Sequence, residues 1–164
     1  MSILDNARAG QNALEQLVNQ IPGFKGYRDK ELRRDADRIH REQLASRLEE
    51  CKRPLDEIAV AATRSGGLDG LNDVEKARKR LDKVTNRIRY ADRGYAGFFA
   101  TLKIDEAALA RVYEFDLALV QGVDAVRSAA GLAGGTPDVS ALIAAVDALD
   151  TRLADREAVL SGMV

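Results

Sequence analysis

Residues 73–95, DVEKARKRLDKVTNRIRYADRGY, decide the fold class. Apolar residues recur in this stretch at steps of three and four, at Val74, Ala77, Leu81, Val84, Ile88, Ala91 and Tyr95. This spacing places them on one face of an α-helix, as in the seam of a coiled coil. Asn72 or Asp73 is expected to cap the amino end of the helix. The stretch therefore predicts an amphipathic helix that packs against other helices.

The sequence before this stretch predicts two further helices. Residues 2–20 form the first, with Ser2 and Asp5 as an acidic capping box, and the helix should end before Pro22. Residues 28–63 form the longest, and Pro54 is expected to kink or restart it, because proline lacks an amide hydrogen. The glycines in residues 65–70 predict that a loop follows.

The sequence after residue 93 predicts a bend and then two more helices. Glycines and aromatic residues in 94–99 interrupt the helical pattern, so we expect a bend there. Residues 105–129 are apolar on most of a helical circumference, which predicts the most buried helix. Three glycines in 131–135 should end it, and Thr136 or Asp138 should cap the last helix.

Composition agrees with a helical domain. The chain has 164 residues, 46% hydrophobic but only 5% aromatic, with 3 prolines and no tryptophan. An aliphatic core of this kind favours helices and argues against an all-β fold. We therefore predict an all-α fold, an antiparallel bundle of four to six helices in a single domain spanning residues 1–164. No apolar run is long enough to cross a bilayer or to serve as a signal peptide, so we expect a cytoplasmic protein.

Residues with metal or nucleophilic chemistry are few. The chain has one histidine, His40, and one cysteine, Cys51. Asp37 and His40 are spaced as in the carboxylate-x-x-His motif of di-iron bundles, but such a centre needs a second histidine. We expect His40 to be half-exposed on a charged helix and Cys51 to pack in the core. The sequence predicts no catalytic residue, no metal site and no cofactor.

Charge is distributed unevenly along the chain. Residues 73–93 carry eight basic and four acidic side chains, whereas residues 105–164 carry four basic and ten acidic ones. Helical spacing places four of the cations on one face, which makes them candidate binding residues: Lys76, Arg80, Lys83 and Arg87. This basic stripe could bind an acidic protein or phosphates, or could be a solvated face whose charges pair within the molecule.

The segment IPGFKGYRDKELRRDADRIHREQLASRLEE, residues 21–50, resembles a family of short bacterial helical proteins with no assigned activity. The resemblance implies a bacterial origin and says nothing about mechanism. In the same segment, Lys25, Tyr27 and Arg28 are expected at the amino end of the long helix. Exposed amide hydrogens and the helix dipole favour an anion at such an end, so these residues are a second candidate binding site.

These patterns favour a non-enzymatic scaffold or adaptor that binds a protein partner or itself. Two alternatives stay open. One is binding of nucleic acid or of an anionic membrane surface through the basic helix, residues 72–93. The other is an enzyme whose carboxylates converge only in the folded chain, a possibility that sequence alone does not exclude.

Overall fold

The computed structural model describes residues 2–29, 31–91 and 106–162. Within these ranges the chain is all-α and has no strand. The helices are α1 (Ile3–Gln20), α2 (Arg33–Glu49), α3 (Lys52–Ser65), α4 (Leu68–Arg89), α6 (Glu106–Ala129) and α7 (Val139–Gly162). The prediction of an all-α bundle is confirmed, and the predicted bend at 94–99 lies outside the described residues.

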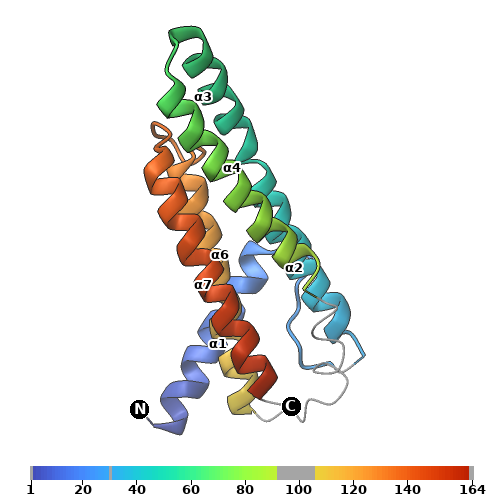
Figure 1. Ribbon diagram of the computed structural model, residues 1–164. Coiled ribbons are helices and arrows are strands. Elements are labelled where there is room, and N and C mark those ends of the chain that lie inside the picture. The colour runs from blue at the N-terminus through green and yellow to red at the C-terminus, as the bar shows by residue number, and fades with distance from the viewer. Residues whose placement is uncertain (1, 30, 92–105, 163–164) are drawn as a thin grey trace.

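Figure 1 shows how the helices are arranged. α2 and α3 together form one long, bent rod that runs antiparallel to α4. α6 and α7 form a second antiparallel pair, and α7 packs on α4 while α6 packs on α2. α1 crosses α6 at the lower end of the bundle. α3 and the first turns of α4 extend beyond the loop that joins α6 to α7.

The predicted capping box of the first helix is confirmed. The Ser2 side chain accepts a hydrogen bond from the Asp5 amide at 3.2 Å, and the Asp5 carboxylate accepts one from the Ser2 amide at 3.1 Å. These contacts satisfy two backbone groups at the start of α1. The helix ends at Gln20, before Pro22, and buries Ala13 and Leu17 against the core.

The long helix begins at Arg33, so the prediction of a start at residue 28 is wrong. Before it, the chain forms a turn held by buried aromatic side chains, among them Tyr27. The Tyr27 amide donates to the Tyr113 hydroxyl of α6 at 3.0 Å, in place of a helical carbonyl. Gly26 has φ +88°, and a Cβ there would lie 2.7 Å from the same hydroxyl. Contact with α6 therefore keeps this segment out of the helix.

Pro54 interrupts the long helix as predicted. α2 ends at Glu49 and α3 begins at Lys52, and the Cys51 amide bonds to the Leu48 carbonyl three residues back at 3.0 Å. Because proline has no amide hydrogen, the carbonyl four residues before it loses its helical partner. Leu48 and Cys51 stay fully buried across this bend. The bend thus keeps the apolar stripe of both helices turned inward.

α4 carries the predicted seam as far as Ile88, but the helix begins earlier than predicted and ends at Arg89, before Ala91. The last predicted seam residue, Tyr95, lies outside the described residues. Val74, Ala77, Leu81, Val84 and Ile88 are all buried, which confirms the helical face inferred from their spacing. The helix starts at Leu68 rather than at residue 72 or 73, so the prediction of a loop through residue 70 is also wrong. Only Gly66, which has a left-handed conformation, and Gly67 separate it from α3.

α6 is the central helix of the described structure. It buries ten residues and packs on α1, α2 and α7. Gly131 and Gly134 have positive φ values in the turn that follows. Asp138 then caps α7, because its carboxylate accepts a hydrogen bond from the Ala141 amide at 3.0 Å. Of the two predicted capping residues, Thr136 and Asp138, it is therefore Asp138 that caps the helix.

Candidate functional site

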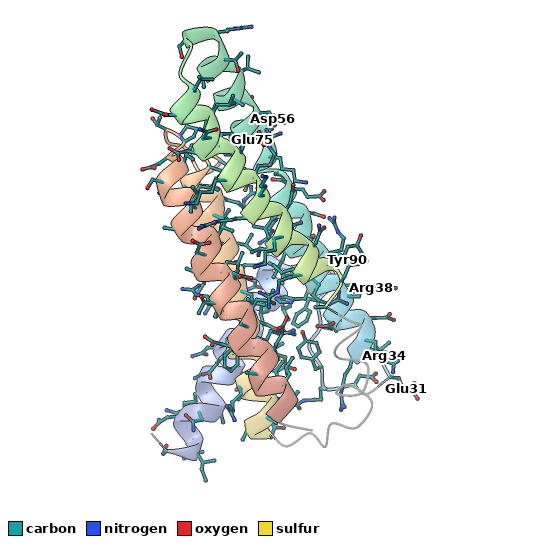
Figure 2. The ribbon with its side chains drawn as sticks, viewed as in Figure 1. Glu31, Arg34, Arg38, Asp56, Glu75 and Tyr90 are labelled. Carbon is teal, nitrogen blue, oxygen red and sulfur yellow. The ribbon has the colours of Figure 1, made fainter. Side chains whose placement is uncertain are left out.

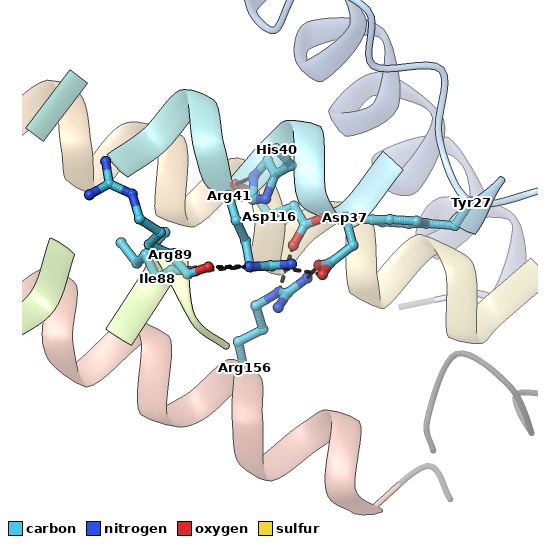
Figure 3. Close-up of polar contacts among 8 residues, drawn as sticks. All are labelled: Tyr27, Asp37, His40, Arg41, Ile88, Arg89, Asp116 and Arg156. Atoms are coloured by element: carbon cyan, nitrogen blue, oxygen red, sulfur yellow. Dashed lines mark hydrogen bonds and ion pairs between the residues drawn. The ribbon is translucent and has the colours of Figure 1, made fainter. Parts of the chain in front are cut away.

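Four buried charged side chains meet between α2, α6 and α7 (Figure 3). They are Asp37 and Arg41 of α2, Asp116 of α6 and Arg156 of α7, and each is at most 4% exposed. The Arg156 guanidinium donates to Asp116 at 2.7 Å and to Asp37 at 3.2 Å. Arg41 donates to the other Asp37 oxygen at 2.8 Å. These four residues form the buried charge network, in which two cations balance two anions.

The buried charge network extends to the turn before α2 and to the end of α4. Tyr27 is 1% exposed, and its hydroxyl donates to the second oxygen of Asp116. Arg41 also donates to the backbone carbonyl of Arg89 at 2.6 Å, at the carboxyl end of α4. A cation is favoured there by the helix dipole and by carbonyls that lack helical partners. The network therefore connects α2, α4, α6 and α7.

His40 is fully buried beside this network, so the prediction of a half-exposed side chain is wrong. Its Nε2 lies 3.3 Å from the Asp116 backbone carbonyl, and its ring packs beside Phe24. Its Nδ1 has no hydrogen-bond partner among the described residues. Burial lowers the pKa of His40, and the charge of Arg156 lowers it further, while Asp116 and Asp37 oppose the shift. The ring is therefore held neutral.

The carboxylates of the buried charge network already have hydrogen-bond partners within the protein, which indicates a structural role. Each of the four carboxylate oxygens of Asp37 and Asp116 already accepts a hydrogen bond from Tyr27, Arg41 or Arg156. A substrate or metal could use these oxygens only by displacing a buried partner, which is costly. No cluster of three His, Cys, Asp or Glu side chains suited to a metal ion occurs in the described parts of the chain.

The basic stripe lies beside α7. Arg80 pairs with Asp147, Lys83 lies 3.8 Å from Asp150, and Arg87 pairs with Asp150 and also with Glu157 at 3.1 Å. Lys76 is exposed. Three of the four predicted residues therefore pair with acidic side chains across the contact between α4 and α7. The acidic partners raise the pKa of Arg87 even though partial burial opposes the shift.

The second predicted group is not brought together at a helix end. Lys25 and Arg28 are exposed in the turn before α2, whereas Tyr27 points inward to Asp116. Arg28 instead pairs with Glu106 of α6 at 3.2 Å, and both side chains are 77% exposed. This pair borders a cleft of about 360 Å³ between α1 and α6, which is otherwise lined largely by apolar residues.

Cys51 packs in the core as predicted, with no exposed surface. Burial raises the pKa of its thiol to about 11, although Arg127 lowers it in part. The effect of burial on this pKa therefore outweighs the charge of Arg127. A thiol of this kind is protonated and unreactive at neutral pH.

Residues 56–73 form a feature that sequence analysis missed, here named the hairpin tip. None of these residues is buried, although they include Ile58, Val60, Leu68 and Leu71. Val60 is 51% and Leu68 74% exposed. In Figure 2, Asp56 and Glu75 mark the level at which the tip leaves the bundle. The apolar periodicity of α3 indicates a core face, but beyond Leu55 that face packs mainly on α4 among the described helices.

No helix in the described ranges is both long enough and apolar enough to cross a membrane. Comparison of the chain with protein-family models, with curated proteins and with solved structures finds no match. The function is therefore inferred from the geometry of the described residues.

Proposed function

We propose that the protein is a non-enzymatic helical scaffold or adaptor whose hairpin tip binds another protein chain. The observation that carries this proposal is the stretch of residues 56–73, which contains no buried residue and yet holds several aliphatic side chains. Apolar surface that stays in water contributes nothing to folding. Docking of a partner on the tip would remove this surface from water and stabilise the complex.

The rest of the bundle holds the hairpin tip in a fixed position. The buried charge network joins four helices at the opposite part of the molecule, and α4 continues without a break from the tip to that network. A continuous helix transmits position well, because its backbone hydrogen bonds resist bending. The tip is thus presented at a defined distance from the network.

The charges favour a protein partner over nucleic acid. Arg80, Lys83 and Arg87 already face carboxylates of α7, so phosphates would have to compete with Asp147 and Asp150. The tip itself carries both signs of charge among its apolar residues. Mixed charge around apolar surface suits a protein interface better than a phosphate backbone.

Site-specific photo-crosslinking in the native cell tests the proposal. A photoreactive amino acid replaces Val60 on the tip, and a matched variant carries it at the exposed Glu42 of α2. We expect a discrete crosslinked product from position 60 and none of that size from position 42. Equal products from the two positions, or none from either, would contradict the proposed function.

A further inference from the structure

The outer face of α3 combines charged and apolar side chains, most of them on the hairpin tip. This face consists of Arg53, Glu57, Val60, Ala61 and Arg64, which line one shallow groove together with the edge residue Asp56. The opposite side of α3 packs on α4. Two ion pairs flank that contact, Lys52 with Asp82 at 2.7 Å and Asp56 with Arg78. The outer face therefore has no neighbour among the described helices.

Two opposite charges on this face, Glu57 and Arg64, lie at equal distances from the midpoint between Val60 and Ala61. Glu57 lies three residues before Val60, and Arg64 lies three residues after Ala61. In an antiparallel pair of α3 helices related by a two-fold axis, Glu57 of each copy would face Arg64 of the other. A parallel pair would instead place like charges opposite one another. The face is thus complementary to itself in one orientation only.

The side chains are available for this contact. Arg64 is exposed and makes no ion pair with any described residue. Among the described residues, Glu57 has only a long contact of 3.9 Å with Arg53, in which both side chains are more than 70% exposed. Exposed pairs of this kind contribute little to folding and can exchange partners. Val60 and Ala61 supply the apolar centre that such an interface needs.

We propose that a second copy of this chain occupies the outer face of α3, in an antiparallel arrangement centred on Val60 and Ala61. This inference rests on the proposed function and names the partner of the same surface. The face extends over about three helical turns, so it would bury less than the roughly 1,200 Å² of a standard stable interface. The dimer is therefore weak, depends on concentration and loosens with added salt.

Charge exchange tests the arrangement directly. Sedimentation equilibrium of the full chain over a concentration series should show a rise toward twice the monomer mass. Arg64→Glu and Glu57→Arg alone should each weaken dimerisation by about tenfold, because the two-fold axis turns two attractive pairs into two repulsive ones. The double variant Glu57→Arg with Arg64→Glu should restore it, since the pairs are re-formed with exchanged signs.

Matched variants separate the interface from general charge or surface effects. Arg38→Glu alters an exposed pair on α2 and should leave dimerisation unchanged. Val60→Asp should abolish dimerisation, whereas Val18→Asp, at a valine of α1 that is 45% exposed, should not. Helical circular dichroism should remain the same in all variants, because each changed side chain is exposed.

The inference and the proposed function fail in different ways. A chain that stays monomeric at every concentration, or single charge reversals that dimerise as the parent does, would overturn the inference. If position 60 still crosslinks to a different protein in the cell, the proposed function survives that failure. Loss of both the dimer and the crosslink would remove both.

Discussion

Asp37 and Arg156 lie 119 residues apart in the chain, and their side chains meet at 3.2 Å inside the bundle. Arg156 is 1% and Asp37 2% exposed, and Arg156 also holds Asp116 at 2.7 Å. One guanidinium of α7 therefore connects α2 and α6. A buried ion pair adds little net stability, but removing one partner leaves a charge without compensation. The contact thus selects one register of α7 against its neighbours.

The first prediction concerns this guanidinium. Arg156→Met keeps an unbranched side chain but leaves Asp37 and Asp116 with one buried cation fewer, so the free energy of unfolding should fall by about 3–5 kcal/mol. Urea denaturation followed by circular dichroism measures this change. Arg152→Met is the matched control on the same helix, because that side chain is exposed and, within the described ranges, donates only to the Ala118 backbone carbonyl at 2.8 Å. Equal losses of unfolding free energy in the two variants would contradict the structural role of Arg156.

The second prediction is a dependence of stability on pH that comes from His40. Burial lowers its pKa from the ordinary value of 6.5, so the folded protein keeps the ring neutral. The unfolded chain takes up the proton first as pH falls, and stability should therefore be complete above pH 6.5 and decline below it. The slope contributed by one such group is at most about 1.4 kcal/mol per pH unit.

Because His40 is the single histidine of the chain, this effect can be measured without overlap. Its imidazole signal in NMR should titrate below pH 6.5 in the folded protein. His40→Gln should reduce the slope of unfolding free energy between about pH 6.5 and 5, and leave the slope above pH 7 unchanged. The groups that surround the ring, Asp37, Asp116 and Arg156, remain in the variant. An unchanged slope would show that the folded ring accepts a proton readily.

The third prediction concerns the Tyr27 hydroxyl. Tyr27→Phe removes the donor to Asp116 and leaves a buried carboxylate oxygen without that hydrogen bond, which should cost about 1–3 kcal/mol. Tyr90→Phe, at a tyrosine that is 58% exposed, should cost almost nothing. Burial, and then the charge of Asp116, raise the pKa of Tyr27 well above 10. In an ultraviolet pH titration, the tyrosine that ionises at the highest pH should therefore be missing from the Tyr27→Phe variant and present in the Tyr90→Phe variant.

Local patterns explain which parts of the fold could be predicted. The seam of α4, the Ser2 capping box and the break near Pro54 depend on residues within a few positions of one another, and all three are present. The start of α2 depends instead on Tyr113, which is 86 residues from Tyr27. A sequence pattern carries no information about a partner that distant.

The candidate site was harder to predict than the fold for the same reason. Asp37, His40 and Arg41 are polar, so their sequence pattern favours a helical face exposed to solvent. In the folded chain they are buried because Asp116 and Arg156 lie against them. The basic stripe was recognised as a group, but its pairing with α7 depends on how two helices meet. The hairpin tip was missed because an apolar periodicity shows which face is apolar and not whether another element covers it.

The last prediction concerns the crossing of α1 and α6. A Cβ added at Gly10 would lie 2.4 Å from the Ala110 Cβ and 2.5 Å from its Cα, so the two helix backbones approach too closely for alanine. Gly10→Ala should therefore reduce the unfolding free energy by about 1–3 kcal/mol, even though alanine favours helix. Because the Ala110 Cα remains in place, adding Ala110→Gly should not restore the loss. Gly70→Ala is the control, since its nearest neighbour would lie 4.0 Å away, and this variant should be neutral or slightly stabilised. Full rescue by Ala110→Gly would show that side-chain volume, rather than backbone approach, sets this crossing.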